Sequence, residues 1–193
     1  IEAETLKPSK RWVSAGHGKT GTIHLEILGC DGLPNTDFNV NDFADPFVGI
    51  VFEDSMVRTD IIWDDLNPRW LPWTTRAFIF KVRHPASILM LGVFDYDELP
   101  VDFHDPLGRV VINTSSFRCN TEYVLHYKLH HDPRENDTVP RGNIIIRLRI
   151  NWEQESEAMK LSFTPAPQFL INVDNVKSHN VLRYITRGAI DME

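Results

Sequence analysis

The sequence predicts an all-β protein, folded as an eight-stranded antiparallel β-sandwich with short N- and C-terminal extensions. Short segments of alternating apolar and polar residues recur between residues 21 and 153, and turn-forming pairs such as Asn67-Pro68 and His84-Pro85 separate them. No segment before Trp152 has the longer apolar period of a helix. Many short strands with this punctuation are typical of a β-sandwich.

The first predicted strand begins at Gly21, where Ile23, Leu25 and Ile27 alternate with polar residues. Further strands are expected over residues 47–52, 57–62, 76–82, 88–94, 108–112, 122–129 and 143–152. The last of these has the clearest pattern, because every second residue from Ile144 to Trp152 is apolar. No strand is expected before Gly21.

The ends of the chain differ in character from its middle. Residues 1–20 are predicted to be an arm or linker, residues 21–153 the sandwich domain, and residues 154–193 an extension or a linker towards a further domain. A short helix is expected over residues 153–161, and Ser178 is a suitable N-cap for a second helix that ends at Arg187. Basic and apolar residues lie side by side in this second helix, which leaves a juxtamembrane segment open as an alternative. Because the chain begins with Ile1 rather than Met, we expect that it is part of a longer protein.

Composition argues against several classes of protein. Hydrophobic residues make up 42% of the chain and charged residues 24%, which is ordinary for a globular domain, and the net charge of −7 argues against a nucleic-acid partner. No apolar run approaches the roughly 18 residues of a membrane-spanning helix, and no signal peptide is present at the N-terminus. Cys30 and Cys119 are expected to remain reduced thiols, as in a cytoplasmic protein.

Other polar residues on the strands are expected to have ordinary roles. His126 and His130 share one strand face but lack the Cys or carboxylate partners of a zinc site. Lys128, Arg147 and Arg149 are interpreted as solvated side chains that could at most form a weak basic face.

Two acidic loops are the most informative part of the sequence. The first, residues 33–47, contains Asp37 and Asp45, and the second, residues 94–105, contains Asp95, Asp97 and Asp105. Carboxylates at this density repel one another unless a cation lies between them. Calcium takes about six to eight oxygen ligands, so two loops suit it better than one, and neither loop has the Gly and Glu positions of an EF-hand. The sequence therefore predicts calcium between the loops.

Several motifs resemble those of C2 domains, and the resemblance covers approximately residues 21–153. They are Leu33-Pro34-Asn35-Thr36-Asp37, Ala44-Asp45-Pro46-Phe47, Leu66-Asn67-Pro68-Arg69-Trp70, and the pair Asp95-Tyr96-Asp97 and Asp105-Pro106-Leu107-Gly108. The resemblance implies that Asp37, Asp45, Asp95, Asp97 and Asp105 ligate calcium. Both loops are longer than is common in the family, so Asn39, Asp42 and Asp102 are possible additional ligands. Because the strand over residues 143–152 comes last, the permuted, phospholipase-like strand order (type II) is expected.

Apolar side chains at the loop tips are predicted to contact a membrane: Phe38, Val40, Phe43, Leu99, Val101 and Phe103. The alternative is that they fold back over the end of the sandwich. We expect a non-catalytic, calcium-dependent module that binds phospholipid membranes from the cytoplasmic side, within a larger signalling or membrane-trafficking protein. The alternative function is a C2-shaped protein-interaction or regulatory domain with a structural or vestigial metal site. An enzyme is disfavoured, because no base or nucleophile stands out beside the aspartates.

Overall fold

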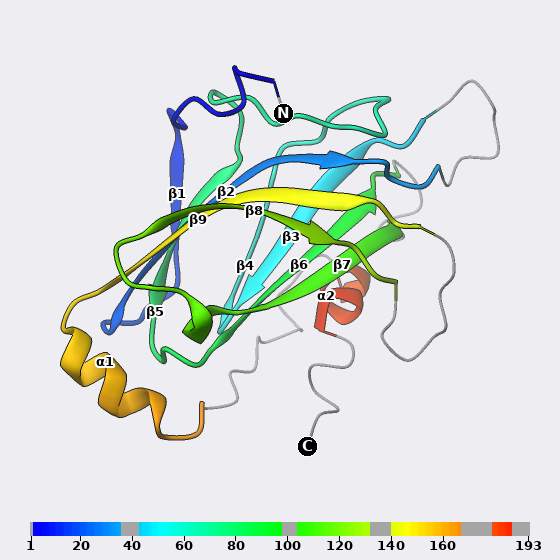
Figure 1. The fold of residues 1–193 in the computed structure, drawn as a ribbon. Coiled ribbons are helices and arrows are strands. Elements are labelled where there is room, and N and C mark those ends of the chain that lie inside the picture. The colour runs from blue at the N-terminus through cyan, green and yellow to red at the C-terminus, as the bar shows by residue number, and fades with distance from the viewer. Residues whose placement is uncertain (1, 36–42, 98–103, 132–139, 167–178, 187–193) are drawn as a thin grey trace.

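The computed structural model of the chain describes residues 2–35, 43–97, 104–131, 140–166 and 179–186, and its strands form two packed sheets (Figure 1). The five-stranded sheet has the order β1 (Trp12–Ala15), β5 (Ala77–Val82), β2 (Gly21–Asp31), β9 (Asn143–Trp152) and β8 (Glu122–Lys128). The four-stranded sheet has the order β4 (Ser55–Arg58), β3 (Pro46–Phe52), β6 (Ile88–Asp95) and β7 (Asp105–Asn113). The predicted β-sandwich is confirmed, but the described part of the chain contains nine strands rather than eight.

The additional strand is β1, and the expectation that no strand precedes Gly21 was wrong. β1 runs parallel to β5 at the edge of the five-stranded sheet, with Trp12 opposite Ala77 and Ala15 opposite Phe80. Only Val13 and Ala15 pack against the core. A strand of four residues with two apolar contacts has too little alternation to be recognised in a segment of mixed charge.

The permuted strand order is confirmed by the pairing of the last strand. β9 lies between β2 and β8 and is antiparallel to both, with Ile23 opposite Ile150 and Leu25 opposite Leu148. The strand expected over residues 57–62 is shorter and ends at Arg58. Beyond Arg58 the chain still runs beside β3 but is no longer a regular strand. The N–H of Ile62, for example, donates to the carbonyl of Pro46 at 3.0 Å.

The main core lies between the two sheets and is formed by the apolar residues of their facing sides. Ile23, Leu25 and Leu148 from the first sheet meet Ile50 and Leu91 from the second, and all are fully buried. Burial of each such side chain contributes about 1.5–3 kcal/mol. The core also includes Trp70 from the Leu-Asn-Pro-Arg-Trp motif, whose indole N–H donates to the carbonyl of Asp60 at 2.7 Å.

A second apolar cluster covers the outer face of the four-stranded sheet, beneath helix α2 (His179–Thr186) (Figure 1). Val181, Leu182 and Ile185 of α2 are buried there against side chains of β3 and β6. Gly92 leaves the room for this contact, since a Cβ at that position would lie 2.7 Å from Cγ1 of Ile185. The apolar residues that left a juxtamembrane segment open are therefore used inside the fold.

The other expected helix is α1 (Glu155–Ser162), which follows β9 directly. Its position agrees with the prediction for residues 153–161. Among the described residues, no helix is long and apolar enough to cross a membrane.

The N-terminal arm is fastened to the sandwich by the fully buried guanidinium of Arg76. It donates to the carbonyls of Thr5 and Lys7 at 2.8 and 2.7 Å, and to the hydroxyl of Ser9 at 2.7 Å. The buried carboxylate of Glu26 lies 3.3 Å from Arg76 and 2.7 Å from Arg147, so it is paired with both cations. A buried ionic group is tolerated only when its charge and hydrogen bonds are satisfied in this way.

Replacing Arg76 with Met is therefore expected to lower the free energy of unfolding by about 3–5 kcal/mol. The change removes one of the two cations paired with the buried Glu26 and leaves the carbonyls of Thr5 and Lys7 without their Arg76 donor. Urea denaturation followed by tryptophan fluorescence would measure the change. Arg83→Met is the matched control, because the bridge from Arg83 to Asp54 is partly exposed and worth about 1 kcal/mol or less. Equal losses in the two variants would contradict the role given to Arg76.

Candidate functional site

The acidic residues meet where β3 begins, β6 ends and β7 begins, at the right-hand end of the sandwich in Figure 1. The antiparallel register places Asp95 opposite Pro46 on one side and opposite Asp105 on the other. Because strand pairing determines these positions, Asp45, Asp95 and Asp105 reach the same edge of the sheet. Of the predicted calcium ligands only Asp37 lies outside the described residues, as do the possible additional ligands Asn39, Asp42 and Asp102.

Two of these carboxylates already accept hydrogen bonds from the loop backbone. Oδ1 of the buried Asp95 accepts from the N–H of Asp45 at 2.7 Å, and Oδ1 of Asp45 accepts from the N–H of Asp64 at 2.7 Å. The carbonyl of Asp45 accepts in turn from the N–H of Tyr96 at 3.1 Å. These bonds join the ends of β3 and β6 to the segment between β4 and β5.

Asp97 lies close to two other carboxylates, those of Asp105 and Asp95. Partial burial of its carboxyl raises the pKa of Asp97 above the ordinary value, and the negative charges of Asp105 and Asp95 raise it further. A hydrogen bond from the backbone N–H of Asp105 and the nearby His104 act in the opposite direction. Nδ1 of His104 accepts from the N–H of Asp97 at 3.1 Å, so this nitrogen carries no proton in that bond. The region therefore has an excess of negative charge that a cation would relieve.

The chemistry of these residues suits calcium, since carboxylate and backbone oxygens are its preferred ligands. Within the described residues, however, no group of three or more His, Cys, Asp or Glu side chains is arranged to hold a metal ion. Asp45, Asp95, Asp97 and Asp105 thus supply part of a coordination shell. The rest of the predicted shell belongs to residues 36–42 and 98–103, which lie outside the described part of the chain.

An exposed aromatic pair adjoins the carboxylates. Phe43 is 44% exposed, and the membrane contact expected for it stays a prediction; Phe38, Val40, Leu99, Val101 and Phe103 lie outside the described residues. The second member, Trp63, is 59% exposed and was missed by the sequence analysis.

Trp63 belongs to the segment between β4 and β5, and this segment contacts the acidic loops at two points. The ring of Trp63 meets the ring of Tyr96 edge to face, with centroids 5.9 Å apart. Its neighbour Asp64 accepts a hydrogen bond from the N–H of Phe43 at 2.9 Å. A large aromatic residue followed by Asp64 and Asp65, outside any strand pattern, is the signal that would have indicated this third loop.

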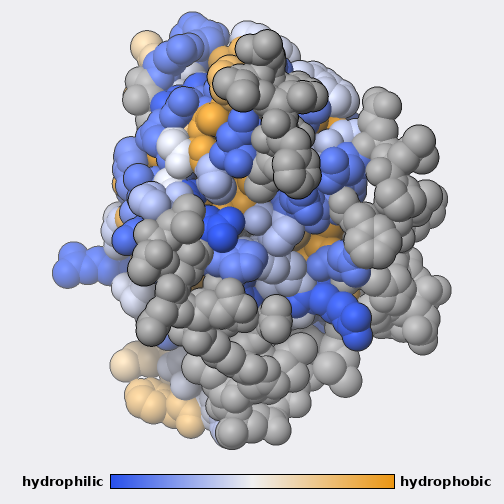
Figure 2. Space-filling view, turned by 90° about the vertical axis from the view of Figure 1, so that its right-hand side faces the viewer, coloured by the Kyte–Doolittle hydropathy of each residue, from blue (hydrophilic) through white to orange (hydrophobic). Residues whose placement is uncertain are grey.

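The same end of the molecule faces the viewer in Figure 2, where hydrophilic residues dominate the described surface and apolar areas are small. The described part of this end therefore presents mainly polar and charged groups with small apolar areas between them.

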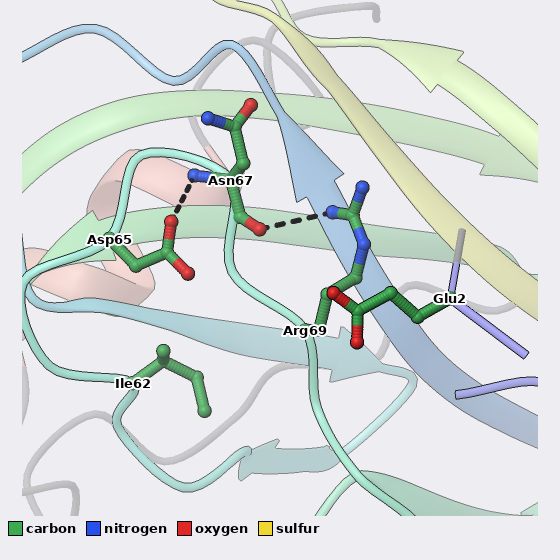
Figure 3. Close-up of a pocket in the computed structure, with 5 residues that line it drawn as sticks. All are labelled: Glu2, Ile62, Asp65, Asn67 and Arg69. Carbon is green, nitrogen blue, oxygen red and sulfur yellow. Dashed lines mark hydrogen bonds between the residues drawn. The ribbon is translucent and has the colours of Figure 1, made fainter. Parts of the chain in front are cut away.

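A hollow of about 630 Å³ lies beside this region and is drawn in Figure 3. Three of its lining residues, Asp65, Asn67 and Arg69, are already bonded to one another, to the nearby backbone or to Asp31. Arg69 bridges to Asp31 at 2.5 Å and donates to the carbonyl of Asn67 at 3.1 Å, while Asp65 accepts from the N–H of Asn67 at 2.7 Å. The hollow thus contains the bonds that shape the Leu-Asn-Pro-Arg-Trp turn, and we assign it no ligand.

Comparison with protein families gives a match to the C2 domain over residues 21–129. "Multiple C2 domain and transmembrane region protein 16" of Arabidopsis thaliana is 32% identical over 76 residues, which are 39% of this chain and 7% of that protein. "Multiple C2 domain and transmembrane region protein 6" of the same plant is 26% identical over 112 residues, which are 56% of this chain and 10% of that protein. The chain therefore spans about a tenth or less of the length of these relatives.

Solved structures share the same fold. A C2 domain of plant extended synaptotagmin 1 has a TM-score of 0.60 and 22% identity, and the match covers 72% of this chain and 99% of that one. Human GIVD cytosolic phospholipase A2 has a TM-score of 0.56 and 17% identity, over 72% of this chain and 17% of that one. The calcium-bound pair of C2 domains of extended synaptotagmin 2 has a TM-score of 0.55 and 20% identity, over 68% of this chain and 46% of that one.

Replacing Asp97 with Asn is expected to raise the melting temperature in metal-free buffer at neutral pH. The native pKa of Asp97 is raised, so its ionised form opposes folding above that pKa. The advantage of the variant should shrink as the pH falls from the raised native pKa towards the ordinary value of 3.8, and it should vanish below that value, where Asp97 is protonated in both states. Glu153→Gln is the control, because Glu153 follows the end of β9, beside the start of β2 and at the opposite end of these strands from the acidic loops. A lower melting temperature for Asp97→Asn, or a difference independent of pH, would contradict the charge excess.

Proposed function

Because the chain belongs to the C2 domain family, we propose that it is a calcium-dependent, non-catalytic module that binds phospholipid membranes. The proposal rests on one observation, the crowding of Asp45, Asp95, Asp97 and Asp105 at the end of the sandwich that also exposes Trp63. The proposed calcium ligands are these four aspartates with Asp37. A calcium-bound structure among the matches, that of extended synaptotagmin 2, supports the choice of metal.

The carboxylates would act as a charge switch. While ionised and unneutralised they repel an anionic membrane surface, and this repulsion falls off over about 8–10 Å at physiological ionic strength. Calcium would supply the opposite charge and coordination positions for lipid phosphate oxygens. The hydrogen bonds that Asp45 and Asp95 accept from the loop backbone would keep the loop bases in place through this change.

Apolar side chains would then provide the remaining affinity. Full burial of each contributes about 1.5–3 kcal/mol, so even partial burial of a few is comparable with the electrostatic contribution. We propose the predicted loop-tip residues together with Trp63 as this contact set: Phe38, Val40, Phe43, Leu99, Val101 and Phe103. Trp63 suits the boundary between head groups and acyl chains, because an indole ring joins a large apolar surface to a polar N–H.

The place of the module in a larger protein follows from the same proposal. The sandwich of residues 21–153 would be the binding unit, acting as a peripheral membrane domain on the cytoplasmic side. Residues 154–193 would carry the chain on towards a further domain, after α2 has docked on the sheet.

A second candidate is a C2-shaped protein-interaction domain with a vestigial metal site. One observation favours it, namely that oxygens of Asp45 and Asp95 already accept backbone hydrogen bonds while no three described acidic, His or Cys side chains form a metal-holding group. In that case binding to vesicles should be absent or should not depend on calcium.

The test is sedimentation of the chain with phosphatidylcholine and phosphatidylserine vesicles, in calcium and in chelator. The wild type should sediment with vesicles only in calcium. Trp63→Ser should weaken this binding about tenfold, because 1.4 kcal/mol of lost apolar burial corresponds to that factor.

Trp73→Ser is the matched control. Trp73 is 55% exposed, but its turn contacts the N-terminal arm, where the N–H of Lys10 donates to the carbonyl of Pro72. This variant should bind as the wild type does. Equal binding in calcium and chelator would favour the second candidate, and equal losses at Trp63 and Trp73 would show that Trp63 makes no special contact.

A further inference from the structure

A groove of about 220 Å³ lies on the outer face of the five-stranded sheet, away from the acidic loops. Leu6, Pro8 and Trp12 of the N-terminal arm and β1 form its apolar wall. Its floor consists of polar side chains that point outward from β2, β9 and β8. The groove exists because the arm is held against the sheet by Arg76.

Strand register assembles the polar floor. His24 on β2 lies opposite Arg149 on β9. Two residues further along the same pair of strands, Glu26 lies opposite Arg147. On the other side of β9, Arg149 lies opposite Glu122 of β8. Cations and acids from distant parts of the chain are therefore neighbours on this surface.

Two buried polar atoms of the floor have no hydrogen-bond partner. They are Nδ1 of His24 and Nε of Arg147, and no other buried side-chain nitrogen or oxygen of the described residues is in this state. The remaining nitrogens of Arg147 are engaged, since Nη1 donates to Glu26 at 2.7 Å and Nη2 donates to the carbonyl of Leu6. Glu122 lies 3.7 Å from Nε, which is too far for a hydrogen bond. Buried polar groups are nearly always bonded, so two exceptions in one groove indicate a missing partner.

The charge of the floor indicates the sign of that partner. Arg149 is exposed, and the described residues offer it no hydrogen bond or ion pair, while the charge of Glu26 is balanced by Arg76 and Arg147. Burial and the charge of Arg149 both lower the pKa of His24, so a negative charge beside this ring would be favourable. Glu122, which is 60% exposed at the rim, opposes an anion.

The apolar wall indicates the rest of the ligand. Trp12 is 39% exposed and meets the ring of His24 edge to face, with centroids 5.6 Å apart. An aromatic or aliphatic group could lie against this indole and Pro8 while its charged end reached the floor.

We propose that this groove binds a small organic anion, with its oxyanion beside Arg149, His24 and Nε of Arg147 and its apolar body against Trp12. A phosphate and a carboxylate share the required chemistry. The site is separate from the acidic loops, so its occupancy does not depend on calcium.

The experiment is a titration of the chain with phenyl phosphate, 3-phenylpropionate and inorganic phosphate, followed by the ¹⁵N-resolved NMR signals of the Trp12 indole and the His24 ring. At least one of the two organic anions should produce saturable shifts of both signals, and these shifts should be equal in calcium and in chelator. The anion that binds more tightly identifies phosphate or carboxylate as the preferred group. Inorganic phosphate should bind at least tenfold more weakly. Equal binding of inorganic phosphate would overturn the role of the apolar wall.

Three variants test the floor. Arg149→Gln should weaken the organic anion at least tenfold, whereas Glu122→Gln should strengthen it severalfold, a gain that misfolding cannot produce. Lys128→Gln, an exposed cation on the same face outside the groove, should change nothing. Absence of saturable shifts with both organic anions, or equal effects of Arg149→Gln and Lys128→Gln, would overturn the proposal.

Discussion

The pairing of Asp95 with Pro46 on one side and with Asp105 on the other is the constraint on which the functional end of this molecule depends. Packing on both faces fixes this register. Val48 and Ile50 of β3 lie in the core between the sheets, whereas Phe47 and Val51 lie in the cluster beneath α2, so a slip of one residue would exchange the two sets. The strands are thus aligned by their hydrophobic residues. Their acidic ends are brought together as a consequence. Burial of the Asp97 carboxyl raises its pKa, and the negative charges of Asp105 and Asp95 raise it further. Core packing in this way holds an electrostatically unfavourable cluster.

Segments at both ends of the chain are built into the sandwich. Arg76 fastens the N-terminal arm, and α2 covers the outer face of the four-stranded sheet where Gly92 leaves room for Ile185. The two attachments differ in their physics, since the first is a buried ionic network and the second is apolar packing. The arm also forms one wall of the groove that exposes Trp12, so its attachment has consequences on a surface far from the acidic loops.

Most of the fold could be predicted because its strands alternate regularly, as from Ile144 to Trp152, and the acidic motifs indicated where β3, β6 and β7 would meet. β1 could not be predicted, since its pairing with β5 is long-range and only Val13 and Ala15 contribute to the core. Trp63 was not predicted because it lies between β4 and β5, outside the two acidic motifs that indicated the membrane contacts. The partners of Arg76 could not be read from the sequence either, because a buried ion network depends on segments that only the fold brings together.

We propose that the aspartates at the ends of β3, β6 and β7 bind calcium. Thermal denaturation of the wild type and of Asp95→Asn combined with Asp97→Asn, with and without millimolar calcium, tests it most directly. A ligand that binds only the native state raises its stability by mass action, so calcium should raise the melting temperature of the wild type, and magnesium should do so less. The double variant should not respond to calcium. An unchanged melting temperature of the wild type in calcium, or an equal shift in the double variant, would contradict the account.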